Sequence, residues 1–124
     1  MNKKFVIRDY IYYLEGEEKP YSGDYAEYWS TTDVLAESFY LSDGKIEGIY
    51  KSYHENGMLA EIGFYKDGKA NGHFKRYYSD GQLAADVHYR DDKFDGYCEF
   101  FKPDGTLDDT ILYSMDSVLE TIKL

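Results

Sequence analysis

Cysteine and proline are nearly absent from this chain of 124 residues, which contains one cysteine and two prolines. A single cysteine, Cys98, excludes an intramolecular disulfide and a metal cluster built on cysteine ligands. With so little proline and no low-complexity run, the chain is predicted to fold, although 31% of its residues are charged. Its length indicates one domain with a modest core.

Long apolar runs are also missing. The N-terminal segment has two lysines, but its apolar run, from Phe5 to Ile7, ends after three residues. A signal peptide needs a longer apolar stretch, and a membrane span needs a longer one still. We therefore expect a cytoplasmic protein in a reducing compartment.

Positive charge is scarce, because 14 Lys and Arg residues stand against 24 Asp and Glu residues, a formal net charge of -10. Binding to a nucleic-acid backbone or to an anionic membrane surface requires clustered cations. The chain is therefore predicted to bind neither. A basic partner protein is compatible with this charge, and so is an acidic surface that serves only solubility.

Glycine and aromatic residues, in contrast, recur every 24 or 25 residues. The anchor positions are Gly23, Gly48, Gly72 and Gly96. An aromatic residue follows each anchor after five residues (Tyr28, Tyr53, Tyr77, Phe101), and a tyrosine after seventeen (Tyr40, Tyr65, Tyr89, Tyr113). Such a period indicates one small unit used repeatedly, each copy burying its apolar side against the next.

Two turn signals bracket each aromatic run, a pattern typical of β-hairpins. The Asx-Gly pairs Asn56-Gly57, Asp80-Gly81 and Asp104-Gly105 are compatible with two-residue type I′ turns. Pro103 favours a type I turn followed by a glycine bulge, because proline suits the second turn position and Gly105 the left-handed one. We predict that geometry in all three copies.

The second loop of each unit carries the pairs Asp43-Gly44, Asp67-Gly68 and Asp91-Asp92. Asp92 can replace glycine because Asp adopts left-handed conformations more easily than most residues. These acidic loops lack the alternating oxygen ligands of a calcium-binding loop, so we interpret them as turns.

Apolar residues recur two, five, eleven, sixteen and seventeen positions after the anchors, with position sixteen not apolar after Gly72. Because these spacings mix odd and even, either both sheet faces carry rings or a bulge redirects one ring. We expect Tyr28, Tyr53, Tyr77 and Phe101 to stack as a core ladder, the alternative being a ligand-stacking platform. Cys98 holds an aromatic position of other units and is predicted to be a buried core thiol.

The two ends depart from the repeat. Residues 5–14 are expected to form one strand, and Thr31-Thr32 replaces the Asx-Gly pair in a degenerate first copy. Met115, Val118, Leu119 and Ile122 have the spacing of a short capping helix, whereas alternation leaves a strand open. We divide the single domain 1–124 into an N-terminal strand (1–12), a degenerate repeat (13–39), repeats (40–64, 65–88, 89–112) and a C-terminal cap (113–124).

The run from Gly48 to Leu59, followed by Tyr65 to Gly72, resembles the MORN-repeat variant of bacterial proteins in the YwqK-type antitoxin family. The resemblance covers residues 40–113 well and 13–39 weakly. It implies an all-β fold, an elongated, twisted antiparallel sheet of successive hairpins. It also implies an antitoxin or immunity-like role, while MORN repeats elsewhere serve as scaffolds or lipid-associated modules.

Catalytic motifs are not found: there is no nucleophile elbow, phosphate loop or HExxH. His54, His73 and His88 occupy three different phases of the unit. His73 and His88 flank one hairpin and could approach each other as a metal pair, although solvated or half-buried histidines are the preferred interpretation. We predict no enzyme activity, no cofactor and no metal.

A repeated hairpin sheet offers a long, rigid surface, so we predict a protein–protein interaction module. One candidate contact row lies six residues after each anchor: Trp29, His54, Tyr78 and Lys102. A second candidate is an acidic end that would meet a basic toxin: Asp91, Asp92, Asp95, Asp108 and Asp109. The alternative function is a structural or self-assembling scaffold.

Overall fold

The computed structural model describes residues 3–123, and all thirteen elements in that range are strands. Their bounds are β1 Phe5–Arg8, β2 Ile11–Leu14, β3 Gly23–Tyr28, β4 Leu35–Ser42, β5 Lys45–Tyr53, β6 Leu59–Lys66, β7 Lys69–Ala70, β8 Gly72–Tyr77, β9 Leu83–Arg90, β10 Lys93–Phe94, β11 Gly96–Phe101, β12 Leu107–Ser114 and β13 Ser117–Lys123. No helix in this range could cross a membrane.

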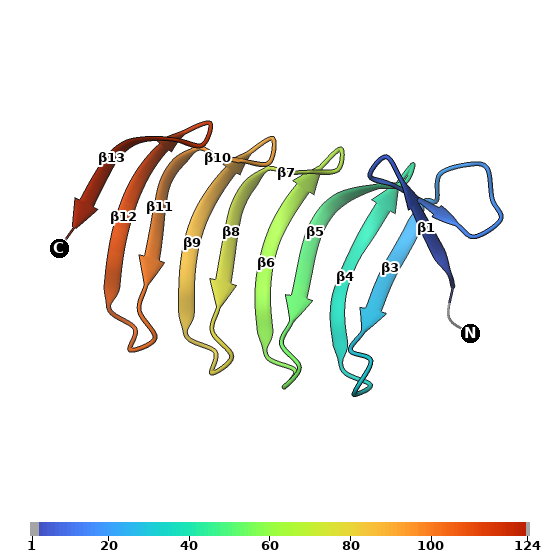
Figure 1. Ribbon diagram of the computed structural model, residues 1–124, viewed down its shortest axis with the longest axis horizontal. Helices are drawn as coiled ribbons and strands as arrows, with labels where there is room; N and C mark the ends of the chain where they lie inside the picture. The colour runs from blue at the N-terminus through green and yellow to red at the C-terminus, as the bar shows by residue number, and fades with distance from the viewer. Residues whose placement is uncertain (1–2, 124) are drawn as a thin grey trace.

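The strands form one open, eleven-stranded sheet and a separate two-stranded hairpin. The sheet order is β13-β12-β11-β9-β8-β6-β5-β4-β3, with β10 paired to β9 and β7 to β6, and every pairing is antiparallel. Neighbours in the sheet are neighbours in the sequence, so the chain runs from one end of the array to the other (Figure 1). The predicted all-β sheet of successive hairpins is confirmed.

Three loops along one edge of the sheet, those of the β5–β6, β8–β9 and β11–β12 hairpins, are type I turns closed by a glycine bulge. The amide of Gly57 donates to the carbonyl of His54 at 2.9 Å, and the amide of His54 donates to Met58 at 2.8 Å. Gly57 has φ 87° and the register shifts next to the loop, as this turn requires. Gly81 and Gly105 repeat these bonds, which confirms the turn predicted from Pro103.

The turns along the opposite edge have positive φ at both central residues, the signature of type I′. Asp91 and Asp92 have φ 49° and 70°, so the left-handed aspartate predicted in place of glycine is confirmed. The second turn residue also binds the preceding repeat: the amide of Asp92 donates to the carbonyl of Ala70 at 2.9 Å. Gly68 and Asp116 make the equivalent bonds, so backbone hydrogen bonds connect each turn to the preceding repeat.

Two bulges in each unit explain the mixed spacing of its apolar residues. One lies beside the anchor glycine, where Ser38 pairs with Lys51 but Tyr40 pairs with Glu47. The other precedes the bulged turn, between Ser52 and Tyr53. Rings nevertheless project from both faces, so both of the open alternatives are realised.

One face of the sheet, which we call the core face, carries a continuous series of packed rings. The series is Tyr25, Phe39, Tyr50, Tyr65, Phe74, Tyr89, Phe94 and Tyr113. Neighbouring ring centroids lie between 4.5 and 5.8 Å apart. Leu41, Val87 and Cys98 are fully buried. The predicted core thiol is thus confirmed, and burial raises the pKa of Cys98.

The expected ladder of Tyr28, Tyr53, Tyr77 and Phe101 is wrong. None of these residues belongs to a ring pair among residues 3–123, and the side chain of Tyr28 is 57% exposed. Each lies three residues after a core-face position, and residues an odd number apart in a strand project to opposite faces.

At the two ends of the chain, one expectation is wrong and one of two alternatives is realised. Residues 5–14 form the β1–β2 hairpin rather than one strand, because Asp9 and Tyr10 take φ 52° and 65° and reverse the chain. This hairpin packs on the core face, where Phe5 lies 5.0 Å from Tyr25. At the C-terminus the strand alternative is realised and the capping helix is not: β13 pairs with β12 after a type I′ turn, which makes β13 the edge of the sheet.

Candidate functional site

The face opposite the core face, which we call the open face, presents three rows of side chains across the strands. Row one is Tyr40, Ile49, Phe64, His73, His88, Tyr97 and Leu112. Row two is Ser38, Lys51, Ile62, Lys75, Asp86, Glu99 and Thr110, which are paired in unbroken register. Row three is Tyr28, Ala36, Tyr53, Ala60, Tyr77, Ala84, Phe101 and Asp108.

Row one is exposed from Tyr40 to Tyr97, and all of its members except His73 and His88 are aliphatic or aromatic. Each member is flanked by a core-face residue, so alternation turns it outwards. The exposed fractions are 61% for Ile49, 53% for Tyr97 and 46% for Phe64. Single exposed apolar residues are common, but a contiguous row of them marks an interaction surface.

The open face is hollowed between its large side chains. Tyr40, Ile49 and Ser38 are among the residues that line one depression. A second is lined by Tyr28 and Tyr53 with Ala36 and Ala60 among the lining residues. Large side chains on alternate strands therefore form the walls of shallow grooves, and small side chains on the strands between them form the floors.

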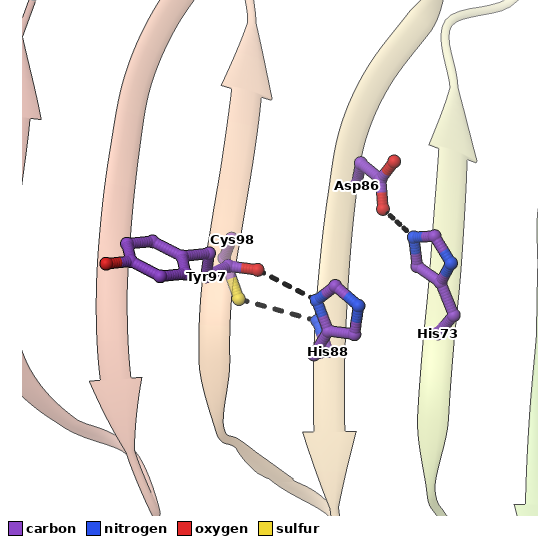
Figure 2. Close-up of polar contacts among 5 residues, drawn as sticks. All are labelled: His73, Asp86, His88, Tyr97 and Cys98. Atoms are coloured by element: carbon purple, nitrogen blue, oxygen red, sulfur yellow. Dashed lines mark hydrogen bonds and ion pairs between the residues drawn. The ribbon is translucent and has the colours of Figure 1, made fainter.

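His73 and His88 meet in the middle of row one, as predicted from their places in one hairpin. Their rings are stacked with centroids 4.5 Å apart and an interplanar angle of 10°. His73 Nε2 contacts the carboxylate of Asp86, and His88 Nδ1 donates to the carbonyl of Tyr97 at 2.8 Å (Figure 2). Both imidazoles are thus held in place by oxygen atoms of neighbouring residues.

His54 lies apart from that pair, so the three histidines do not converge. Its Nε2 is 2.8 Å from the carbonyl of Tyr77, at the bulged-turn edge. Within residues 3–123, no three or more His, Cys, Asp or Glu side chains are arranged to hold a metal ion. The array therefore offers the open face, rather than a metal centre, as its candidate site.

The predicted contact row of Trp29, His54 and Tyr78 connects the repeats to one another. Each side chain bonds to the carbonyl oxygen at the same position of the next unit. The indole of Trp29 donates to Tyr53 at 3.1 Å, and the hydroxyl of Tyr78 donates to Phe101 at 2.5 Å. The fourth member, Lys102, is exposed at the end of the row. These bonds engage the polar ends of the first three side chains.

The predicted acidic end is divided between two edges of the sheet. Asp91, Asp92 and Asp95 lie at the type I′ edge, whereas Asp108 and Asp109 begin β12 at the opposite edge. β11 runs between the two groups (Figure 1). The structure therefore does not gather these carboxylates into one patch.

Two of the same aspartates have structural partners. The carboxylate of Asp92 accepts the amide of Ala70 at 2.6 Å, and that of Asp95 accepts the amide of Met115 at 3.1 Å. Both bonds join neighbouring units of the array. Asp91 and Asp108 are exposed, and Asp109 is half-buried.

The core face carries a second polar row beside its rings. Glu27 stands directly opposite Glu37 on the neighbouring strand, and like charges in that position repel. Burial, then the charges of Glu27 and Glu61, raise the pKa of Glu37, although a hydrogen bond from Tyr50 opposes them.

Further along the same row the charge is balanced. Arg76 Nε donates to Glu61 at 2.5 Å, and its Nη2 donates to the Tyr89 hydroxyl at 2.6 Å. Burial raises the pKa of Tyr65 to about 12, with smaller contributions from Glu61 and other nearby charges. The tyrosine hydroxyls of the core face are therefore kept protonated well above neutral pH.

Sequence reasoning missed row one as a surface. Phe64 was recognised as apolar, but the face to which its side chain projects depends on the two bulges of each unit. The positions of these bulges cannot be read from the sequence. The available signal was the pair of positions one and sixteen residues after each anchor, which hold Ile49 with Phe64 and Tyr97 with Leu112.

Comparison with known families recognises the two central units. Residues 46–67 and 70–91 match the family model described as MORN repeat variant, and these segments cover the β5–β6 and β8–β9 hairpins. MORN repeats are generally associated with protein-binding or membrane-binding modules and are generally non-catalytic. No curated protein and no solved structure matches the chain.

Proposed function

We propose that this protein is a non-catalytic protein–protein interaction module that binds its partner on the open face. The contiguous exposed row one is the observation that carries the proposal, because exposed aromatic and aliphatic side chains supply most of the energy at protein interfaces. The matches to the MORN repeat variant support a binding role in general.

The finer proposal is an antitoxin or immunity-type role in the bacterial cytoplasm, with a basic toxin as the partner. Its support is the net charge of -10 together with the resemblance of the repeat. Such a charge attracts a basic protein from a distance and speeds association, while the apolar contacts of the open face determine the lifetime of the complex.

Enzyme activity is not part of this proposal. The polar groups at the centre of the open face are held by their neighbours, as His73 is by Asp86 and His88 by Tyr97. Catalysis requires a nucleophile or a general base that faces a bound substrate, and apart from this histidine pair row one presents only aliphatic, phenylalanine and tyrosine side chains.

Copurification from the native cell tests the proposal, with mass spectrometry to identify the bound proteins. We expect the wild-type chain to retain a protein partner and Phe64→Asp, which places a charge in row one, to lose it. Tyr10→Asp is the matched control, because Tyr10 is 93% exposed in the β1–β2 turn, outside the open face. Recovery of a small metabolite without protein, or equal retention by Phe64→Asp, would contradict the proposal.

A scaffold that self-assembles through its terminal hairpins is the second candidate. The observation that favours it is the edge strand β13, where Val118 is 57% and Leu119 64% exposed. Unpaired edge strands add further strands readily. Size-exclusion chromatography with light scattering should then show assemblies that grow with concentration and are abolished by Leu119→Pro, and a strict monomer would exclude this role.

A further inference from the structure

We infer that a second copy of this chain covers the open face when no other partner is bound. The two copies are related by a two-fold axis that runs parallel to the strands and passes between β8 and β9. This inference rests on the proposed function of the open face as a docking surface, and it names an occupant of that surface. The axis exchanges β8 with β9, β6 with β11, β5 with β12 and β4 with β13.

The apolar residues of row one are matched by this exchange. Phe64 on β6 meets Tyr97 of the second copy, because Tyr97 lies on β11 in the same row. Ile49 on β5 likewise meets Leu112 of the second copy on β12, and His73 meets His88. Two sheets that pack face to face interdigitate such rows about 10 Å apart.

The two central charges of row two are arranged for the same axis, whereas Glu99 meets Ile62 and Lys51 meets Thr110 of the second copy. Lys75 on β8 faces Asp86 of the second copy, and symmetry creates this pair twice. Row two contains two lysines, Lys51 and Lys75, and two acids, Asp86 and Glu99, so it is neutral in a chain of net charge -10. An axis placed on β8 itself would bring Lys75 against Lys75 instead.

Row three adds complementarity of size. Large residues lie on β5, β8 and β11, whereas small or polar ones lie on β6, β9 and β12. The axis places Tyr77 over Ala84 of the second copy and Phe101 over Ala60, so each ring enters a groove. Large side chains opposite small ones are what well-packed layers require. An axis on a strand would stack ring on ring.

The available area is sufficient for a weak dimer. Tyr40, Ile49, Phe64, His73 and Tyr97 are each about half exposed, and large side chains of that exposure offer roughly 100 Å² apiece. The five thus supply about 500 Å² of the roughly 800 Å² per partner in a standard interface. The half-buried members of rows two and three have to supply the remainder.

Reversal of the central charge pair gives a sharp test. Lys75→Glu places acid opposite Asp86 of the second copy, and Asp86→Lys places base opposite Lys75, so neither variant can pair with itself. A mixture of the two variants restores both intermolecular pairs, whereas positions 75 and 86 within each chain still carry like charges. Rescue by mixing is therefore specific for this interface and cannot come from the stability of a single chain.

The measurement is sedimentation velocity of the full chain from micromolar to millimolar concentration, with circular dichroism to verify folding. We expect a wild-type dimer, a dissociation constant raised on the order of tenfold or more for each single variant, and recovery in the mixture. Lys19→Glu, in the exposed loop between β2 and β3 and outside the sheet, changes the net charge by the same amount as Lys75→Glu and is the control that should remain dimeric.

A wild-type monomer throughout this range would overturn the inference, and so would single variants that dimerise like the wild type. The two proposals can fail separately. A monomer whose copurified partner is released by Phe64→Asp refutes the second copy and keeps the proposed function. A dimer that is rescued by mixing, from a chain that captures no other protein, supports the second copy and refutes the proposed function.

Discussion

Gly63 offers the most direct test of which face holds the core. It lies on β6 opposite Tyr50, within the sheet rather than in a turn. A methyl group added at Gly63 would lie 2.3 Å from Cδ2 and Cε2 of Phe74 and 2.4 Å from its Cγ. The ring of Phe74 cannot withdraw easily, because it is 2% exposed and lies 4.9 Å from Tyr89 on its far side.

Gly63→Ala is therefore expected to destabilise the protein by about 2 kcal/mol. Overpacking of a well-packed core costs roughly 1–3 kcal/mol, although alanine is otherwise about 0.5–1 kcal/mol better than glycine within a strand. Urea unfolding measured by circular dichroism gives the free energy of unfolding. In a double-mutant cycle, Phe74→Leu should remove at least about 1 kcal/mol of that cost, because the shorter side chain vacates the contact.

Gly48→Ala is the control for the same chemical change without the contact. No atom lies within 4 Å of a methyl group added at Gly48, whose φ of 89° imposes only backbone strain. That strain should cost about 1 kcal/mol and show no coupling to Phe74→Leu. If Gly63→Ala leaves stability unchanged or increases it, Phe74 does not pack against β6 and the assignment of the core face is refuted.

Three further predictions concern the bonds between units and the buried charges. Tyr78→Phe should lower the free energy of unfolding by about 1 kcal/mol, because it removes a bond between units, whereas Tyr40→Phe should change it by less than about 0.5 kcal/mol. Glu37→Gln should stabilise the protein at neutral pH by roughly 0.5 kcal/mol, because the pKa of Glu37 is raised in the folded protein and its ionisation therefore costs stability as the pH rises through that pKa. In urea unfolding at acid pH, where Glu37 is protonated, the variant and the wild type should show the same free energy of unfolding. Stability should also fall as the pH rises from about 10, the ordinary tyrosine pKa, through about 12, the pKa of Tyr65 in the folded protein. Parallel titrations would follow tyrosine ionisation by absorbance and unfolding by circular dichroism. If every tyrosine ionised before the protein unfolded, this prediction would be contradicted.

The hairpin array was predictable because individual residues determine the type of each turn. Pro103 was enough to select the type I turn with a glycine bulge, and the same turn occurs at Gly57 and Gly81. The C-terminal segment was left open between a helix and a strand because its turn, Met115-Asp116, contains no glycine, although both residues take positive φ. Its place 24 residues after Asp91-Asp92 was the signal that favoured a strand over a helix.

The candidate site was harder to predict, because membership of a face depends on counting residues across bulges. Each unit has a register shift at its anchor glycine and another at its turn, and either one changes which side chains face outwards. The aromatic residue five positions after each anchor was consequently assigned to the core, although Tyr28 is exposed. The row of Trp29 and His54 was found by its phase, but its bonds to the next unit depend on three-dimensional stacking.

The central claim, that the open face receives the partner, is tested most directly by mapping the contact surface in solution. Nuclear magnetic resonance shifts would be followed while the copurified partner is titrated into the labelled chain. Perturbations concentrated at Tyr40, Ile49, Phe64 and Tyr97, with the core-face ring of Tyr65 unaffected, are the predicted result. Perturbations confined to β13, or to the β1–β2 hairpin, would contradict the account.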